Sequence, residues 1–316
     1  AITIDHVNGD GLFFCGCQKG FLLPALADSD FVQCAVGPGE LARMTIAEEA
    51  ADTDAAKQVK KPGARAKLVA AIWLVLSLLA LVAAAAVLVF AIYHASSFVF
   101  GQVAIQQAVD SVRQVPVKSM DSAPQSVQRR FFVLLNVLFF CLGAPVLLAA
   151  LIGVGRQWRQ RLALVVCDRK PAKITLALLF FAMPAYLIVA SAMIKYFYPG
   201  FTTWFFVPED PATMALSFLA VVIMAPLAEE LLFRGWIFGG LCKAFAPASA
   251  VFVTTLLFAL AHGDGGMLYP LAVFVPGLVL TLVRYWSGTV WAGFAAHATY
   301  NAWAWFLVFA LGKDFV

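Results

Sequence analysis

The feature that most constrains this chain is a long apolar run near its start. Residues 68–93 contain no charged side chain, and about 20 apolar residues are enough for a helix to span a bilayer. Six further apolar segments follow at 131–155, 174–194, 213–241, 248–262, 267–283 and 289–311. We therefore predict an all-α integral membrane protein, a polytopic bundle of about seven transmembrane helices.

The composition favours the same class. Apolar residues make up 62% of the chain and charged residues 13%, against roughly 45–50% and ~25% in soluble domains. A soluble globular protein could not hide so much apolar surface. The net charge of +4 is too small to indicate nucleic-acid binding, and no nucleic-acid partner is expected.

Three segments differ in character. Residues 1–67 are mixed and moderately polar, and we interpret them as a small cytoplasmic N-terminal extension ending in a basic linker. Residues 68–212 would hold the first three transmembrane helices, and 213–316 the rest of the bundle. Basic residues gather before the first span and again in the loop at 156–173. The positive-inside rule places both in the cytoplasm, and the C-terminus on the opposite side.

The N-terminal extension contains a weak candidate metal site. His6, Cys15, Cys17 and Cys34 carry zinc-binding atoms. However, only one residue separates Cys15 from Cys17, whereas zinc sites typically have two to four between such cysteines. We favour the alternative, in which these are reduced cysteines buried in a small domain.

The segment 213–241 carries three charged side chains at membrane depth, Glu229, Glu230 and Arg234. Each costs about 2.5–3.5 kcal/mol at the bilayer centre, even on a lenient scale. Glu230 and Arg234 are four residues apart, so they share a helix face and can pair. Glu229 lies about 100° round the helix and is left to face a cavity, where a desolvated carboxylate suits a general base. The ion pair alone is equally well explained by helix packing.

Two of the four histidines lie in the later apolar segments. His262 ends one segment, and His297 lies four residues before Asn301, so these last two share a helix face. Counted along straight helices from the segment ends, Glu229 and His262 each lie about 21 Å deep and His297 about 12 Å. Given boundary errors of a few residues, all three fit one layer. A lone membrane histidine or asparagine usually joins helices, but this set on three helices favours a functional site.

Three motifs on successive apolar segments resemble those of one family of membrane enzymes. They are Glu229-Glu230-x-x-x-Arg234, Phe258-x-x-x-His262 and His297-x-x-x-Asn301. The ordered set is similar to the CAAX protease and bacteriocin-processing (CPBP) family of intramembrane endopeptidases, which includes the type II CAAX prenyl endopeptidase. The resemblance covers about residues 213–311, and it identifies 213–316 as a CPBP-like catalytic membrane core.

The resemblance implies hydrolysis of a peptide bond near the membrane-embedded or prenylated C-terminus of a protein or peptide. Glu229 would activate water, supported by the other two charged residues of its motif. His262 would position the water or stabilise the tetrahedral oxyanion, and His297 and Asn301 would complete that role. Donors directed at a developing oxyanion in a low-dielectric cavity stabilise a transition state strongly.

The residues leave open whether a metal takes part. Glu229, His262 and His297 could ligate Zn²⁺ with one position left open. Metal-free catalysis by water activated at a glutamate is compatible with the same residues, and we favour it. The expected partners are a protein or lipid-modified peptide substrate and membrane lipid.

Two other functions compete with the endopeptidase. A non-catalytic membrane scaffold or immunity protein could keep the fold and bind a partner, although the intact motifs argue against it. A proton-coupled transporter could use a buried Glu/His relay, but transporters are commonly built from internal repeats, and none is evident in the sequence.

Overall fold

The computed structural model of the chain describes residues 63–154, 157–165, 170–197, 199, 206–263 and 268–312. Within these ranges the chain forms helices joined by turns, without strands. The all-α membrane fold class is thereby confirmed. The zinc candidates His6, Cys15, Cys17 and Cys34, and residues 1–62 of the predicted N-terminal extension, lie outside the described residues.

The long helices follow the predicted apolar segments in chain order. They are α3 (Ala64–Phe100), α5 (Gln125–Val154), α7 (Lys170–Phe197), a composite helix from α8 to α10 (Pro211–Leu241), α11 (Pro247–Leu260), α12 (Leu268–Ser287) and α13 (Val290–Leu311). The short helices α4 (Gln102–Arg113), η3 (Val117–Ser122) and α6 (Trp158–Arg161) connect them. Of the helices in the described part, five are long and apolar enough to cross a membrane. The count of seven spans therefore stays a prediction.

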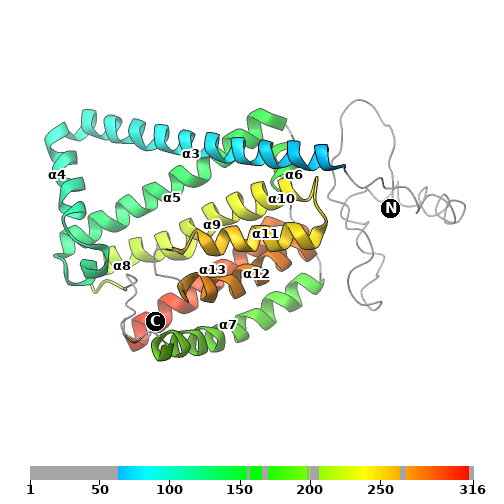
Figure 1. The fold of residues 1–316 in the computed structure, drawn as a ribbon. Helices are drawn as coiled ribbons and strands as arrows, with labels where there is room; N and C mark the ends of the chain where they lie inside the picture. The colour runs from blue at the N-terminus through cyan, green and yellow to red at the C-terminus, as the bar shows by residue number, and fades with distance from the viewer. Residues whose placement is uncertain are drawn as a thin grey trace, which may run out of the picture.

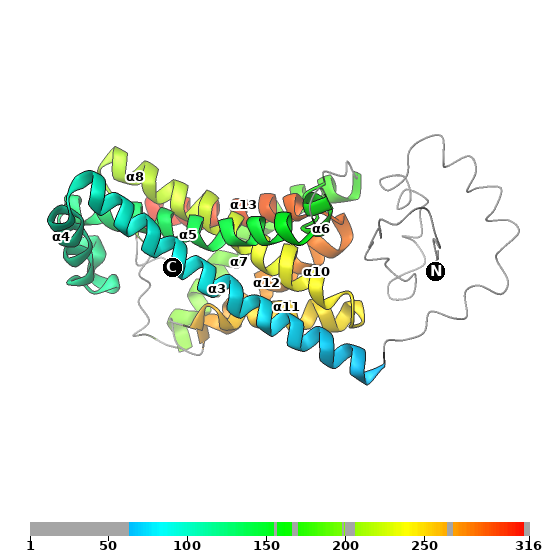
Figure 2. The same cartoon turned by 90° about the horizontal axis from the view of Figure 1, so that it is seen from above.

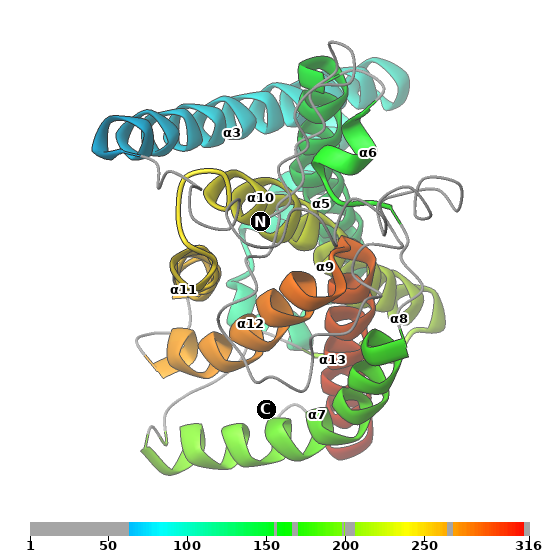
Figure 3. The same ribbon diagram turned by 90° about the vertical axis from the view of Figure 1, so that its right-hand side faces the viewer.

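The long helices run side by side in one bundle (Figure 1). Figure 3, which looks along the bundle, shows α3 and α7 at opposite edges with α9, α12 and α13 between them. α3 exposes apolar side chains along its whole length, among them Leu76 and Phe90, as a helix in contact with lipid would. At one end of the bundle, α4 crosses from the end of α3 towards α5 (Figures 1 and 2).

The start of α13 is tied to the turn that follows α6. The carbonyl of Ala163 accepts hydrogen bonds from the Val290 backbone N–H (2.9 Å) and the Thr289 hydroxyl (3.1 Å). The indole N–H of Trp291 donates to the carbonyl of Leu164 (2.9 Å). Thr289 is also the N-cap of the helix, because its side chain accepts from the Trp291 backbone N–H. These bonds fix the helix that carries the last of the three motifs.

The composite helix begins at the N-cap Asp210. The Asp210 carboxylate accepts from the hydroxyl (2.5 Å) and the backbone N–H (2.9 Å) of Thr213, and it pairs with Arg129 (2.9 Å). The Thr213 hydroxyl first, and Arg129 after it, lower the pKa of Asp210 from 3.8 to about 2. Because folding lowers the pKa of Asp210, the ionised carboxylate stabilises the folded state at pH values above its ordinary pKa of 3.8. This stabilisation is lost as the pH falls through about 2.

Asp210→Ala is expected to lower the melting temperature by about 2–4 °C at neutral pH, because α8 loses its N-cap. The difference between wild type and variant should shrink as the pH falls from about 4 to about 2, where the cap is protonated in the folded protein. Thermal unfolding in detergent at a series of pH values measures both effects. A difference that stays constant over this range would contradict the assigned cap.

Candidate active site

The composite helix that carries the glutamates is not a regular α-helix. It consists of α8 (Pro211–Phe218), η5 (Leu219–Met224), α9 (Ala225–Glu229), η6 (Glu230–Ile237) and α10 (Phe238–Leu241). The elements η5 and η6 are π-helical; at the end of η5, the N–H of Ala225 reaches five residues back to the carbonyl of Ala220. Such wide turns occur frequently at functional sites. Here they lie on both sides of Glu229.

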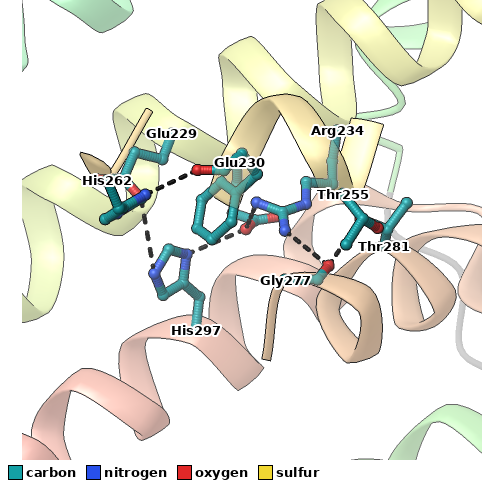
Figure 4. Close-up of polar contacts among 9 residues, drawn as sticks. Glu229, Glu230, Arg234, Thr255, His262, Gly277, Thr281 and His297 are labelled. Carbon is teal, nitrogen blue, oxygen red and sulfur yellow. Dashed lines mark hydrogen bonds and ion pairs between the residues drawn. The ribbon is translucent and has the colours of Figure 1, made fainter. Parts of the chain in front are cut away.

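Glu230 and Arg234 form the ion pair that their spacing predicts (Figure 4). Nη1 of Arg234 lies 2.9 Å from Oε1 of Glu230, and both side chains have no exposed surface. Nη2 of Arg234 donates to the carbonyl of Gly277 on α12 (3.0 Å), and the guanidinium lies 4.1 Å from the ring centre of Phe258. The pair thus joins the composite helix to α11 and α12 deep inside the bundle.

His297 on α13 lies between the two glutamates. Its Nδ1 lies 3.0 Å from Oε1 of Glu230, and its Nε2 lies 3.7 Å from Oε2 of Glu229. Oε1 of Glu230 also accepts a hydrogen bond from Nη1 of Arg234, and a carboxylate oxygen in this role is an acceptor for its other neighbours as well. We therefore assign the proton of this bond to Nδ1, which leaves Nε2 facing Glu229.

The carboxylate of Glu229 differs from that of Glu230 in what surrounds it. The Glu229 side chain keeps 21% of its surface exposed. Its Oε2 is itself buried and has no hydrogen-bond partner among the described residues. A separation of 3.7 Å from His297 Nε2 exceeds hydrogen-bond length but suits two groups that share one water. The geometry agrees with the expectation that one glutamate is neutralised locally while the other stays available.

His262 lies in the turn just after α11, because the helix ends at Leu260 and not at His262 as the apolar segment suggested. Its Nδ1 lies 2.8 Å from the carbonyl of Phe258. A carbonyl can only accept, so Nδ1 is the donor and Nε2 is free to accept a hydrogen bond. The Phe258 ring lies next to both imidazoles. Its centre is 4.7 Å from the centre of the His262 ring and 5.8 Å from the centre of the His297 ring.

Asn301 binds the backbone of the composite helix. Pro226 has no N–H, so the carbonyl of Val221, five residues earlier, lacks the donor that a π turn would supply. Nδ2 of Asn301 donates to this carbonyl instead (2.8 Å). One amide hydrogen of Asn301 is therefore committed to a structural bond, and an oxyanion role would depend on the other.

The sequence did not indicate the contacts that Phe258, Gly277 and Gly293 make at the site, although Phe258 belongs to the second of the three motifs. A Cβ on Gly293 would lie 2.6 Å from Oε2 of Glu230, and a Cβ on Gly277 would lie 2.8 Å from the Phe258 ring. The absence of both side chains lets α12 and α13 approach the buried network. Small residues in membrane helices do signal close packing, but the sequence cannot name the side chain that packs against them.

Among the described residues, no group of three or more histidine, cysteine, aspartate and glutamate side chains is arranged to hold a metal ion. Oε1 of Glu230 is engaged by Arg234 and His297, and Nδ1 of His262 by a backbone carbonyl. The zinc alternative for Glu229, His262 and His297 and the metal-free reaction both stay predictions.

The comparison with known proteins agrees with the motifs. Residues 211–303 match the family described as type II CAAX prenyl endopeptidase Rce1-like, which confirms the resemblance predicted from the three motifs over this segment. No curated protein and no solved structure matches the chain. Together with the five long apolar helices, the match identifies an integral membrane protein. The orientation predicted from the basic residues stays a prediction.

Proposed function

We propose that this protein is an intramembrane endopeptidase that hydrolyses a peptide bond with water activated by Glu229. One observation carries the proposal: a partly exposed glutamate has a buried oxygen without a hydrogen-bond partner among the described residues, 3.7 Å from an imidazole nitrogen. In the neighbouring Glu230, Oε1 accepts from Arg234 and His297, and Oε2 is buried without a hydrogen-bond partner among the described residues. Glu230 is paired with a cation and has no exposed surface, whereas Glu229 is partly exposed to solvent and keeps an oxygen free for the proton that a general base accepts.

The residues around Glu229 suit the same reaction. A water bound to Oε2 of Glu229 could donate its second hydrogen to Nε2 of His262, which is free to accept. With both hydrogens of the water held in this way, a lone pair on the water oxygen would point at the carbonyl carbon of the scissile peptide bond. The apolar walls of the site keep the local dielectric low, so dipoles directed at the developing oxyanion act strongly.

The proposed substrate is the membrane-embedded or prenylated C-terminus of a protein or peptide. This substrate class follows from the family resemblance, and the position of the site inside an apolar bundle supports it. A lipid-modified segment can enter from the bilayer without losing the apolar surroundings of its chain. Membrane lipid is then the second expected partner.

Cleavage by the purified protein in lipid nanodiscs tests the proposal. A farnesylated CAAX peptide panel, the same peptides without the lipid and a transmembrane peptide are incubated with wild type, and products are identified by mass spectrometry. We expect one defined cut in the farnesylated peptides and slower or no cleavage of the unmodified ones. A wild type that is folded yet leaves every peptide intact would instead favour the non-catalytic scaffold.

Chelation tests the metal-free reaction in the same assay. For the proposed metal-free reaction, we expect EDTA and 1,10-phenanthroline to change the cleavage rate by less than about twofold. A zinc-dependent peptidase with an open coordination position serves as the positive control for chelation. Loss of activity that added Zn²⁺ restores would overturn the prediction.

A further inference from the structure

The contacts of His297 assign different tasks to its two ring nitrogens. Nδ1 lies 3.0 Å from Oε1 of Glu230 and Nε2 lies 3.7 Å from Oε2 of Glu229. The imidazole is nearly fully buried, at 6% exposure, so these two carboxylates are the groups that its ring nitrogens face. A ring held between two carboxylates is a different arrangement from a simple oxyanion donor.

Glu230 has little freedom to move away from His297. Its Oε1 accepts from both Nη1 of Arg234 (2.9 Å) and Nδ1 of His297. Its Oε2 lies against α13 at Gly293, where a Cβ would come within 2.6 Å. Arg234 in turn is held by the Gly277 carbonyl. The carboxylate is therefore fixed from three sides, and the orientation of the imidazole is fixed with it.

The geometry also provides a path for a proton between His297 and Glu229. Nε2 of His297 and Oε2 of Glu229 lie 3.7 Å apart, a separation that one water can bridge.

We propose that Glu230 is a positioning residue that fixes His297 with Nε2 towards Glu229, and that His297 carries a proton from Glu229 to the leaving nitrogen. This inference rests on the proposed endopeptidase function. It goes beyond the oxyanion role that the resemblance implies for His297, because the imidazole gives up its proton in each turnover.

The proton balance closes over one cycle. Water attacks the scissile carbonyl carbon, and Oε2 of Glu229 takes one of its protons. Nε2 of protonated His297 gives its proton to the amide nitrogen as the C–N bond breaks, which releases a carboxylic acid and an amine. Glu229 then returns the water proton to His297, and both side chains regain their starting states.

Nitrogen NMR on ¹⁵N-histidine-labelled protein tests the positioning without reference to activity. The chain has four histidines, so His297→Gln assigns the signal of interest by its loss. At a pH high enough to remove the Nε2 proton that the cycle uses, we expect the neutral ring of His297 to keep its proton on Nδ1, the reverse of the form that prevails in water. A neutral ring protonated on Nε2, with Nδ1 bare, would overturn the inference.

Two variants test its consequence for turnover. Glu230→Gln removes the charge behind the imidazole, and we expect kcat to fall by about 10²–10⁴-fold with KM changed less than about threefold, as when a histidine loses its orienting carboxylate. Glu230→Asp should recover part of the loss. Gly293→Ala keeps every charge but displaces Oε2 of Glu230, and it should lower kcat at least about tenfold. Gly153→Ala is the matched control, because no heavy atom lies within 4 Å of its added Cβ.

The outcomes separate this inference from the proposed function. If wild type cleaves and Glu230→Gln or Gly293→Ala cleaves equally fast, the positioning role is wrong while the endopeptidase stands. If no substrate is cleaved but the NMR shows Nδ1 protonated, the orientation is right and the endopeptidase is wrong.

Discussion

Glu229→Gln is expected to lower kcat of peptide cleavage by about 10²–10⁴-fold, the usual contribution of a general base. Glutamine keeps the volume and the hydrogen-bonding shape of the side chain but cannot accept the proton of the attacking water. Because Oε2 of Glu229 has no hydrogen-bond partner among the described residues, the fold should tolerate the change. Initial rates in nanodiscs measure the loss, and a melting temperature within about 2 °C of wild type shows that the variant is folded.

Glu209→Gln is the matched control for this variant. Glu209 is an exposed glutamate just before the start of α8, so the same carboxylate-to-amide change occurs away from the network. Its cleavage rate should equal that of wild type. Retention of more than about half of the wild-type rate by Glu229→Gln would assign the general base to another group.

Arg234→Leu is expected to lower the free energy of unfolding by about 3–5 kcal/mol, because it leaves the carboxylate of Glu230 buried without its cation. Both members of the pair have no exposed surface, and leucine also gives up the bond to the Gly277 carbonyl. The variant should unfold about 10 °C earlier in detergent or fail to accumulate. Thermal unfolding followed by circular dichroism measures the shift.

Two further variants separate lost charge pairing from lost packing. Arg129→Leu breaks the ion pair with Asp210, in which the Arg129 side chain is 52% exposed, and surface pairs contribute only ~0–1 kcal/mol. It should change the melting temperature little.

The double variant Glu230→Leu/Arg234→Met removes both buried charges and should recover much of the stability lost by Arg234→Leu, although it cannot recover cleavage. A double variant as unstable as the single one would show that packing, and not the unpaired charge, determines the loss.

Contacts within one helix could be predicted from the sequence. The apolar segments located the long helices, and the spacing of Glu230 and Arg234 predicted their ion pair. Both inferences use local periodicity, since residues four apart share a helix face whatever the rest of the fold does. The order of the three motifs also identified the family that matches residues 211–303.

Contacts between helices could not be predicted in the same way. Nothing in the sequence showed that His297 would face Glu230 with one nitrogen and Glu229 with the other, or that Asn301 would bind the carbonyl of Val221. These depend on how far α13 is rotated and how closely it approaches, which the absent side chain of Gly293 helps to decide. The π-helical turns were also missed, because apolar periodicity over so few residues does not separate a turn of 3.6 residues from a wider one.

The wide turns before and after Glu229 affect how relatives of this chain can be found. Each π turn holds an additional residue within the same length of helix. A related chain with an ordinary α-helical turn at η5 would have one residue fewer between the N-cap and its glutamates. The glutamates would still lie on the same helix face, because the π turn in the present chain absorbs the additional residue and the rotation of about 100° that it would cause. A search that forbids gaps inside helices would pass over such a chain. One that tolerates a single-residue gap between residues 219 and 237 would recover it.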